Sequence, residues 1–198
     1  MNYDIKNNTL EECQNHWKNP KDHNQPENYN KQHTQQRSRY LLSLFNKYKI
    51  NKSSTILEIG CNCGRNLNYL YNAEYNKLFG IEISRKALEF QKSFFPGLKA
   101  NLINSSIEDH ILFFKDNQFD VIFTMAVLQH IHIDSNWIFE HIARICKKYL
   151  LLIELDTRDY VDIFSKLGFS LIEQRNCNQI QGLEKYKFRI MFKKKGKI

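Results

Sequence analysis

The fold is set by the stretch Ile56-Leu57-Glu58-Ile59-Gly60-Cys61-Asn62-Cys63-Gly64-Arg65-Asn66-Leu67. The apolar, β-branched run at 55–59 predicts a buried strand, which ends at Gly60. The residues that follow, with Leu67 and Leu70 one turn apart, predict a helix. A strand, a tight glycine turn and a helix in this order are typical of open α/β sheets, which bind nucleotides beyond the carboxyl ends of their strands.

The turn excludes two familiar nucleotide-binding motifs. The dinucleotide fingerprint G-x-G-x-x-G would need glycines at 60, 62 and 65, but this chain has Asn62 and Arg65 at the last two positions. A P-loop is also excluded, because no Gly-Lys-Ser/Thr sequence follows the turn. The turn retains Glu58, two positions before Gly60, and a second glycine at 64. Glycine lets the backbone approach a ligand closely, and asparagine is the non-glycine residue best able to adopt a left-handed turn.

Strands and helices alternate along the rest of the chain. Apolar runs predict further strands at 78–83, 100–104, 119–125 and 149–155, mostly separated by helices with one apolar face. Ser84 and Asp134 are the predicted N-caps of two of these helices. Two final strands, at 169–174 and 186–192, have no helix between them. The pattern predicts an α/β fold with a Rossmann-like, doubly wound, mostly parallel sheet and an antiparallel C-terminal edge strand.

The first 30 residues differ in composition from the remainder. They are rich in Asn, His, Lys and Gln, contain Pro20 and Pro26, and carry scattered aromatic residues such as Trp17 and Tyr29. We predict an irregular polar arm at 1–30, able to act as a lid, followed by one folded domain at 31–198. The total of 198 residues suits a single domain with a full hydrophobic core.

Composition and charge narrow the class of protein. No stretch approaches the roughly 18 consecutive apolar residues of a membrane span, and no signal-peptide core is found at the N-terminus, so we expect a cytoplasmic protein without a membrane partner. Five cysteines without a C-x-x-C pair fit reduced thiols. The net charge of +8 is compatible with an anionic partner such as RNA, phosphate esters or nucleotide sugars. We favour a compositional bias instead, because Asn is also abundant and no predicted helix has a cluster of Lys and Arg on one face.

Four stretches resemble, in the right order, the motifs of class I S-adenosylmethionine-dependent methyltransferases. Residues 58–64 resemble the first motif, acidic-x-G-x-G-x-G, with Asn62 in place of the middle glycine. Residues 78–84 resemble the second-strand motif, and residues 104–109 resemble the loop after the third strand. Residues 119–131 resemble the fourth-strand motif.

This resemblance implies S-adenosyl-L-methionine as the cofactor. Glu82, at the end of the second strand, would accept hydrogen bonds from both ribose hydroxyls, and Glu58 would lie near the methionine end. The full set of residues expected to bind the cofactor is Glu58, Gly60, Cys61, Asn62, Gly64, Glu82, Ile83, Ser106, Ile107 and Met125. Cys61 and Cys63 have no further ligands at zinc spacing, so we predict no metal site.

The candidate catalytic residues follow from the chemistry of methyl transfer. The reaction is an in-line displacement at a sulfonium, so alignment and desolvation supply most of the acceleration, and no protein nucleophile is needed. A general base is needed only if the acceptor must lose a proton. His130 and His132, just after the fourth strand, are the candidate catalytic residues, although position 130 is often structural in the resembling families. Glu154 and Asp156 either line the acceptor pocket or lie on the surface.

The predicted function is methyl transfer to a small polar or sugar-like acceptor. Residues 104–107, 127–131 and 147–154 are most similar to small bacterial methylases associated with sialic-acid-like sugar biosynthesis. A small-molecule acceptor is favoured over a nucleic acid, because the chain has no dedicated nucleic-acid-binding domain. Two alternatives stay open: an RNA or protein methyltransferase that uses the basic surface, and a non-catalytic cofactor-binding partner subunit. The sequence predicts no oligomeric state.

Overall fold

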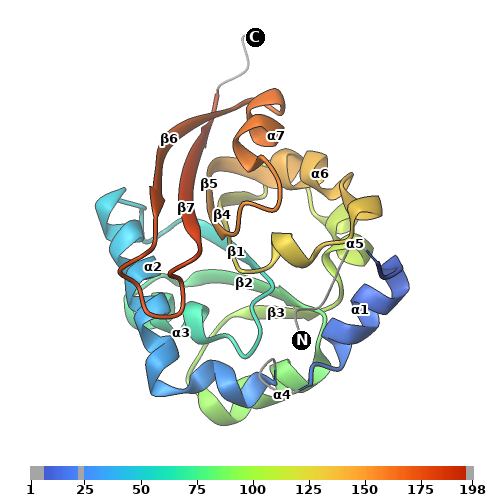
Figure 1. Cartoon of the computed structure of the whole chain (residues 1–198). Helices are drawn as coiled ribbons and strands as arrows, with labels where there is room; N and C mark the ends of the chain where they lie inside the picture. Colours follow the sequence, from blue (N-terminus) through green and yellow to red (C-terminus); the bar gives the residue numbers. More distant parts are fainter. Residues whose placement is uncertain (1–6, 22–24, 195–198) are drawn as a thin grey trace.

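A central sheet organises the computed structural model, which describes residues 7–21 and 25–194 (Figure 1). Within these residues the sheet has seven strands in the order β3-β2-β1-β4-β5-β7-β6. The strands are β1 Thr55–Ile59, β2 Lys77–Glu82, β3 Asn101–Asn104, β4 Phe119–Met125, β5 Cys146–Glu154, β6 Phe169–Asn176 and β7 Lys187–Lys193. The first five are parallel, and β7 is antiparallel to both β5 and β6. The predicted Rossmann-like sheet is confirmed, with its antiparallel region at the C-terminal edge and β6 outermost.

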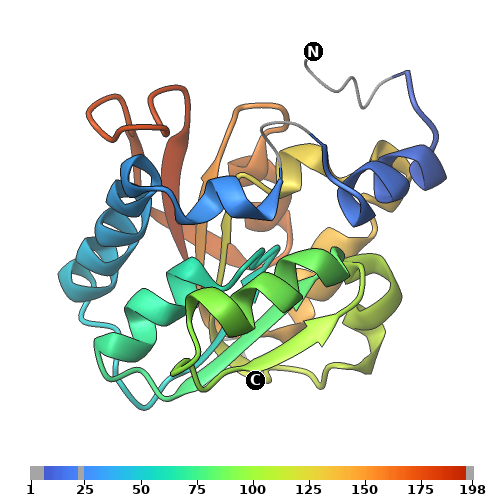
Figure 2. The ribbon, with the colours of Figure 1, turned by 90° about the horizontal axis from the view of Figure 1, so that it is seen from below.

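Helices cover both faces of the sheet (Figures 1 and 2). The α-helices are α1 Leu10–Lys18, α2 Gln35–Lys47, α3 Arg65–Asn72, α4 Arg85–Phe94, α5 Ile107–His110, α6 Ile138–Ile145 and α7 Tyr160–Lys166. Shorter 3₁₀ helices are η2 Pro26–Asn30, η3 Gln32–Thr34, η4 Ile111–Phe113, η5 Leu128–His130 and η6 Ile133–Ser135. Phe45 of α2 and Leu67 of α3 belong to the core on one face, whereas Ile142 of α6 and Phe164 of α7 belong to the core on the other.

The connections change sides of the sheet between β1 and β4. These two strands are neighbours, with Ile56 opposite Val121 and Ile59 opposite Thr124. The helix after β1, α3, packs on one face, and the helix after β4, α6, packs on the other. The loops that leave the carboxyl ends of β1 and β4 therefore diverge and leave a crevice between them, which is where open α/β sheets bind ligands.

The N-terminal segment contains regular structure, so the prediction of an irregular arm is wrong for residues 10–18. Thr9 caps α1: its hydroxyl accepts a hydrogen bond from the Glu12 N–H at 3.2 Å, and the Glu12 carboxylate accepts one from the Thr9 N–H at 2.7 Å. This capping box is a local signal, Thr followed three residues later by Glu, that is present in the sequence. Residues 1–6 and 22–24 of the predicted arm lie outside the described residues.

The two predicted N-caps have different outcomes. The Ser84 hydroxyl accepts from the Ala87 N–H at 3.4 Å, so the N-cap of α4 is confirmed. Asp134 does not cap α6, because it lies inside η6 and α6 begins only at Ile138. The chain makes an extra 3₁₀ turn between the two positions, and helical periodicity does not reveal such a turn. Within residues 7–21 and 25–194, no helix is long and apolar enough to cross a membrane.

Candidate active site

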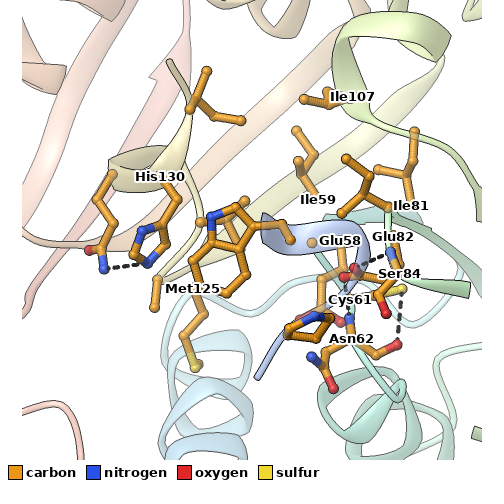
Figure 3. Close-up of a pocket in the computed structure, with 18 of the residues that line it drawn as sticks. Glu58, Ile59, Cys61, Asn62, Ile81, Glu82, Ser84, Ile107, Met125 and His130 are labelled. Atoms are coloured by element: carbon orange, nitrogen blue, oxygen red, sulfur yellow. Dashed lines mark hydrogen bonds between the residues drawn. The ribbon is translucent and has the colours of Figure 1, made fainter. Parts of the chain in front are cut away.

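A cavity of about 1020 Å³ opens at the carboxyl ends of the central strands (Figure 3). This volume lies at the upper end of the roughly 300–1,000 Å³ typical of small-molecule sites, so two small molecules can share it. Of the predicted cofactor-binding residues, those that line it are Glu58, Gly60, Cys61, Asn62, Glu82, Ile83, Ser106, Ile107 and Met125. Gly64 does not line the cavity; it is the left-handed N-cap of α3. Both candidate catalytic residues, His130 and His132, also line it.

The turn after β1 brings backbone to the edge of the cavity. The N–H groups of Gly60 and Cys61 donate to the carbonyl of Ile81 at 2.9 and 3.1 Å. Gly60 has a φ of 73°, and a Cβ at this position would lie 2.4 Å from Cγ2 of Val127, so only glycine fits. Asn62 adopts the left-handed conformation predicted for it, with a φ of 48°. The shape of the turn therefore depends on glycine at position 60 and on a left-handed residue at position 62.

Glu82 lies at the end of β2 with its carboxylate oriented by the backbone. One oxygen accepts from the Asn62 N–H at 2.9 Å and the other from the Ser84 N–H at 2.8 Å. The residue is only 8% exposed, and burial raises the pKa of its carboxyl. Each carboxylate oxygen can accept a second hydrogen bond, so the group retains capacity for two donors on a ligand.

Glu58 is buried more deeply than Glu82, and fewer of its carboxylate oxygens have a hydrogen-bond partner. One oxygen accepts from the Asn66 side-chain amide at 2.7 Å, whereas Oε2 has no hydrogen-bond partner among the described residues. Burial raises the pKa of this carboxyl to about 8. A cationic group in the cavity would complete this site, because it would both satisfy the free oxygen and favour the charged carboxylate.

A buried chain of polar contacts connects Glu58 to the N-terminal segment. Asn66, which holds Glu58, accepts from the Ser38 hydroxyl at 2.6 Å. The Arg65 guanidinium donates to that hydroxyl at 2.8 Å and to the backbone carbonyl of Tyr29 at 2.5 Å. The sequence signal for Arg65 and Asn66 is that they directly follow the glycine turn, and no signal predicts Ser38. The chain of contacts fixes η2 next to the turn after β1.

A family model matches the part of the chain that carries these features. Residues 57–152 match the model described as a methyltransferase domain, and they include the glycine turn, Glu82 and β4. The match supports an S-adenosylmethionine-dependent methyltransferase domain at residues 57–152. S-adenosylmethionine is the methyl donor of this domain.

Solved structures share the fold of the methyltransferase domain. The magnesium protoporphyrin IX methyltransferase of Synechocystis PCC 6803 with bound SAM has a TM-score of 0.65 and 17% identity, over 82% of this chain and 80% of its own. A TehB-like SAM-dependent methyltransferase from Corynebacterium glutamicum has a TM-score of 0.62 and 19% identity, over 86% of this chain and 98% of its own. A SAM-dependent methyltransferase from Aquifex aeolicus has a TM-score of 0.62 and 18% identity, over 87% and 98%. None of the curated proteins is significantly similar to this chain in sequence.

His130 lies across the cavity of the methyltransferase domain from Glu58 and Glu82 (Figure 3). Its Nε2 atom is 3.1 Å from the side-chain nitrogen of Gln129. The Gln129 oxygen accepts from the Leu155 N–H at 3.1 Å, which fixes the amide orientation, so the Gln129 nitrogen donates to His130. The proton of a neutral His130 is therefore on Nδ1. Burial lowers the pKa of His130 to about 4, which keeps the ring neutral at physiological pH.

The helix α1 reaches the same side of the cavity. The ring of Trp17 packs on the ring of His130, with centroids 4.4 Å apart and a tilt of 49°. His132 is buried and caps η6, where its Nδ1 atom accepts from the Asp134 N–H at 3.2 Å. Because Nδ1 of His132 accepts this hydrogen bond, the proton of a neutral His132 ring is on Nε2.

Glu154 and Asp156 do not line the cavity. Glu154 is completely buried at the end of β5, where it accepts from the Val127 N–H at 3.0 Å, and burial raises the pKa of its carboxyl to about 7. Asp156 forms ion pairs with Lys187 and Arg189 at the start of β7. Glu154 thus holds the loop after β4 and fits neither alternative that the sequence offered. Asp156 is exposed and fits the surface alternative.

The cysteines of the described chain are not arranged as a metal site. All five cysteines are free, and Cys61 and Cys63 are buried in the turn after β1. No group of three or more His, Cys, Asp or Glu side chains suited to a metal ion is found among residues 7–21 and 25–194. The absence of a metal requirement stays a prediction.

Proposed function

We propose that the chain transfers the methyl group of S-adenosylmethionine to a small polar, sugar-like acceptor bound in the same cavity. The observation that carries the proposal is that one cavity joins the cofactor-side residues to polar side chains from distant segments. The acceptor-side residues include Tyr29, Gln129, His130, Thr157 and Tyr186. Hydroxyl, amide and imidazole groups of this kind suit an acceptor with several polar substituents.

The cofactor half of the cavity fits S-adenosylmethionine on two observations. Glu82 has two oriented oxygens for the two ribose hydroxyls, and Glu58 has a free buried oxygen for the ammonium of the methionine portion. In this proposal the backbone of Gly60, Cys61 and Asn62 lies against the methionine portion. Ile83, Ser106 and Ile107 border the adenine, and Met125 lies at the centre. When bound, the cofactor supplies a methyl group activated by the sulfonium.

The protein residues contribute alignment and exclusion of water. Trp17 and His130 form an aromatic contact beside the acceptor side, which removes water from this part of the cavity. Neither histidine offers an unprotonated nitrogen to the cavity in this geometry, because Nε2 of His130 accepts from Gln129 and Nδ1 of His132 accepts from the Asp134 N–H. Both histidines then act as positioning residues, and His132 could serve as a general base only after giving up its contact with Asp134.

The N-terminal segment, residues 1–30, serves as the lid of the domain at 31–198. Three contacts of described residues support this role: Trp17 on His130, Arg65 on the Tyr29 carbonyl, and a 3.0 Å ion pair between Glu27 and Lys86 of α4. Deletion of residues 1–28 should then lower turnover more than affinity for the demethylated cofactor. Wild-type turnover of a soluble truncated protein would contradict the lid.

The closer likeness to bacterial methylases of sialic-acid-like sugar biosynthesis supports a sugar-like acceptor. The test is an assay with methyl-labelled S-adenosylmethionine and a small-molecule extract of the source organism, followed by mass detection of the product. We expect a product heavier by one methylene, dependent on intact protein. Labelled RNA or protein in place of a small-molecule product would contradict the proposal, and so would cofactor binding without any turnover.

A further inference from the structure

Charged side chains of both signs line the cavity. Its described carboxylates come from β1, β2 and α5, on the cofactor side: Glu58, Glu82 and Glu108. No other described Asp or Glu lines it. Its described Lys and Arg residues are Arg65, directly after the glycine turn, and three from the segment before α2, from α2 and from the loop before β7: Lys31, Arg37 and Lys185. The last three come from other elements than those that carry the carboxylates.

Arg37 is the best-positioned of these cations. Its Nε atom is buried and has no hydrogen-bond partner among the described residues. The backbone at Gly182, in the loop between β6 and β7, packs directly on the guanidinium, and a Cβ there would lie 2.5 Å from Nη2. Gly182 has a φ of 78°, which also favours glycine. The loop thus accommodates Arg37 at the cavity wall without giving its Nε atom an acceptor.

One carboxylate is found in electrostatic range of Arg37 among the described residues. The charged groups in electrostatic range are Arg65, which repels it, and Glu184, whose carboxylate is exposed and accepts from the Gly182 N–H at 2.9 Å. Tyr29 lies in the same range and has its hydroxyl pKa raised to about 12, chiefly by burial, so it is a neutral donor. Arg65 itself already donates to Ser38 and to the Tyr29 carbonyl. Of the two arginines that line the cavity, Arg37 is therefore the one with an N–H donor that has no partner among the described residues.

Lys31 and Lys185 extend this set of cations to the rim. Both residues are exposed and line the cavity, although they are separated by more than 150 residues of sequence. Tyr186, next to Lys185, has its hydroxyl 3.3 Å from the side-chain nitrogen of Gln129. Lysine ammonium groups at a rim attract an anion, and a guanidinium below them can bind it in a fixed geometry.

We propose that the acceptor of this methyltransferase is an anionic small molecule, whose carboxylate or phosphate binds Arg37 beneath Lys31 and Lys185. This inference rests on the proposed function and specifies its substrate class. The carboxylate in electrostatic range of Arg37 is that of Glu184, which is exposed. Glu58 and Glu82 repel an anion whereas Lys31, Arg37 and Lys185 attract it, so we expect its charged group nearest these three cations.

The first experiment identifies the charge of the natural acceptor. A small-molecule extract of the source organism is separated into anionic, neutral and cationic fractions, and each fraction is incubated with the full-length protein and methyl-labelled S-adenosylmethionine. We expect labelled product from the anionic fraction. Prior treatment with phosphatase distinguishes the two sources of charge: loss of the substrate identifies a phosphate ester, and its survival identifies a carboxylate. Product from the neutral or cationic fraction alone would overturn the inference.

The second experiment tests which cations bind the acceptor, and it uses the anionic fraction as substrate. Lys31→Gln combined with Lys185→Gln should raise KM about ten-fold, with kcat within about two-fold, because loss of charged hydrogen bonds costs roughly this much. The matched control combines Lys92→Gln and Lys99→Gln, two exposed lysines that do not line the cavity, and should leave KM unchanged. Arg37→Gln should raise KM by about a further ten-fold.

Calorimetry with S-adenosylhomocysteine separates failure of this inference from failure of the proposed function. We expect the Arg37 and lysine variants to bind the demethylated cofactor as tightly as the wild type. If Arg37→Gln weakens cofactor affinity as much as it raises KM, the cations bind the carboxylate of the cofactor and the inference is wrong. If the wild type binds no cofactor, or no fraction yields product, the proposed function fails and this inference fails with it.

Discussion

The two halves of the cavity are built in different ways. The cofactor half comes from short stretches around residues 58–64 and 82–84, where backbone N–H groups and left-handed residues orient two buried carboxylates. The acceptor half comes from α1, α2, the loop after β4 and the loop before β7, which meet only in the folded chain. The first half can therefore be recognised from local sequence, whereas the second half, which we propose binds the acceptor, cannot. Four changes, in order of decreasing effect, test this division.

The largest effect concerns the buried carboxyl of Glu58 in the cofactor-free protein. Because its pKa is raised to about 8 from the usual 4.5, the folded chain keeps a proton that the unfolded chain loses between these pH values. This contribution to stability is present at low pH and is lost as the pH rises toward 8, by at most about 1.4 kcal/mol per pH unit. Glu58→Gln removes the titration, so the stability difference between wild type and variant should fall from pH 5 to pH 8.

Urea unfolding at a series of pH values measures this difference. Glu89→Gln is the matched control, since Glu89 is exposed on α4 and pairs with Arg85. It should give a profile parallel to that of the wild type. Parallel profiles for Glu58→Gln as well would mean that the carboxyl is ionised in the folded protein and that the cofactor half is more polar than its burial indicates.

The second effect is on cofactor affinity. Glu82→Ala should weaken binding of S-adenosylhomocysteine by about 2 kcal/mol or more, about thirty-fold, because two ribose hydroxyls lose a charged acceptor. Calorimetry measures it, and a thermal unfolding curve of the ligand-free variant controls for the loss of the contacts to Asn62 and Ser84. Nicotinamide dinucleotide should not compete. Equal affinity in wild type and variant would show that Glu82 does not bind the cofactor.

A third change acts on the acceptor half. Trp17→Ala removes the ring that packs on His130 and should lower kcat about ten-fold, while S-adenosylhomocysteine affinity stays within about two-fold. Trp137→Ala is the control, because Trp137 is 40% exposed at the start of α6 and does not line the cavity. If Trp17→Ala changes affinity and turnover equally, α1 belongs to the cofactor half and the division drawn above is wrong.

The smallest effect is expected from metal removal. The two cysteines of the turn after β1 are buried and, within the described chain, belong to no cluster suited to a metal ion. Dialysis against a chelator should therefore leave the methylation rate within about 20% of the untreated enzyme, given that alignment and desolvation supply the acceleration. A chelator-sensitive rate that zinc or magnesium restores would identify a metal site assembled from distant residues.

Local sequence patterns predict most elements of the fold. The strands at Thr55–Ile59 and Phe119–Met125 agree with the predicted limits to the residue, because a continuous apolar run bounded by turn residues leaves few alternatives. The start of α6 is not predicted from Asp134, since the intervening 3₁₀ turn depends on the contacts of His132 and Asp134. The helix α1 is missed because its mean composition is polar, although its capping box is visible at Thr9 and Glu12.

The sequence by itself determines the sheet, the glycine turn and the carboxylates of the cofactor side, because periodicity and left-handed turn positions are properties of neighbouring residues. Tertiary structure alone decides that Glu154 is buried, that Trp17 packs on His130, and that Lys31, Arg37 and Lys185 line one cavity. These residues are far apart in the chain and show no common spacing. Their proximity results from the packing of α1, α2 and the β6–β7 loop around the sheet, and such long-range packing leaves no periodic signal in the sequence.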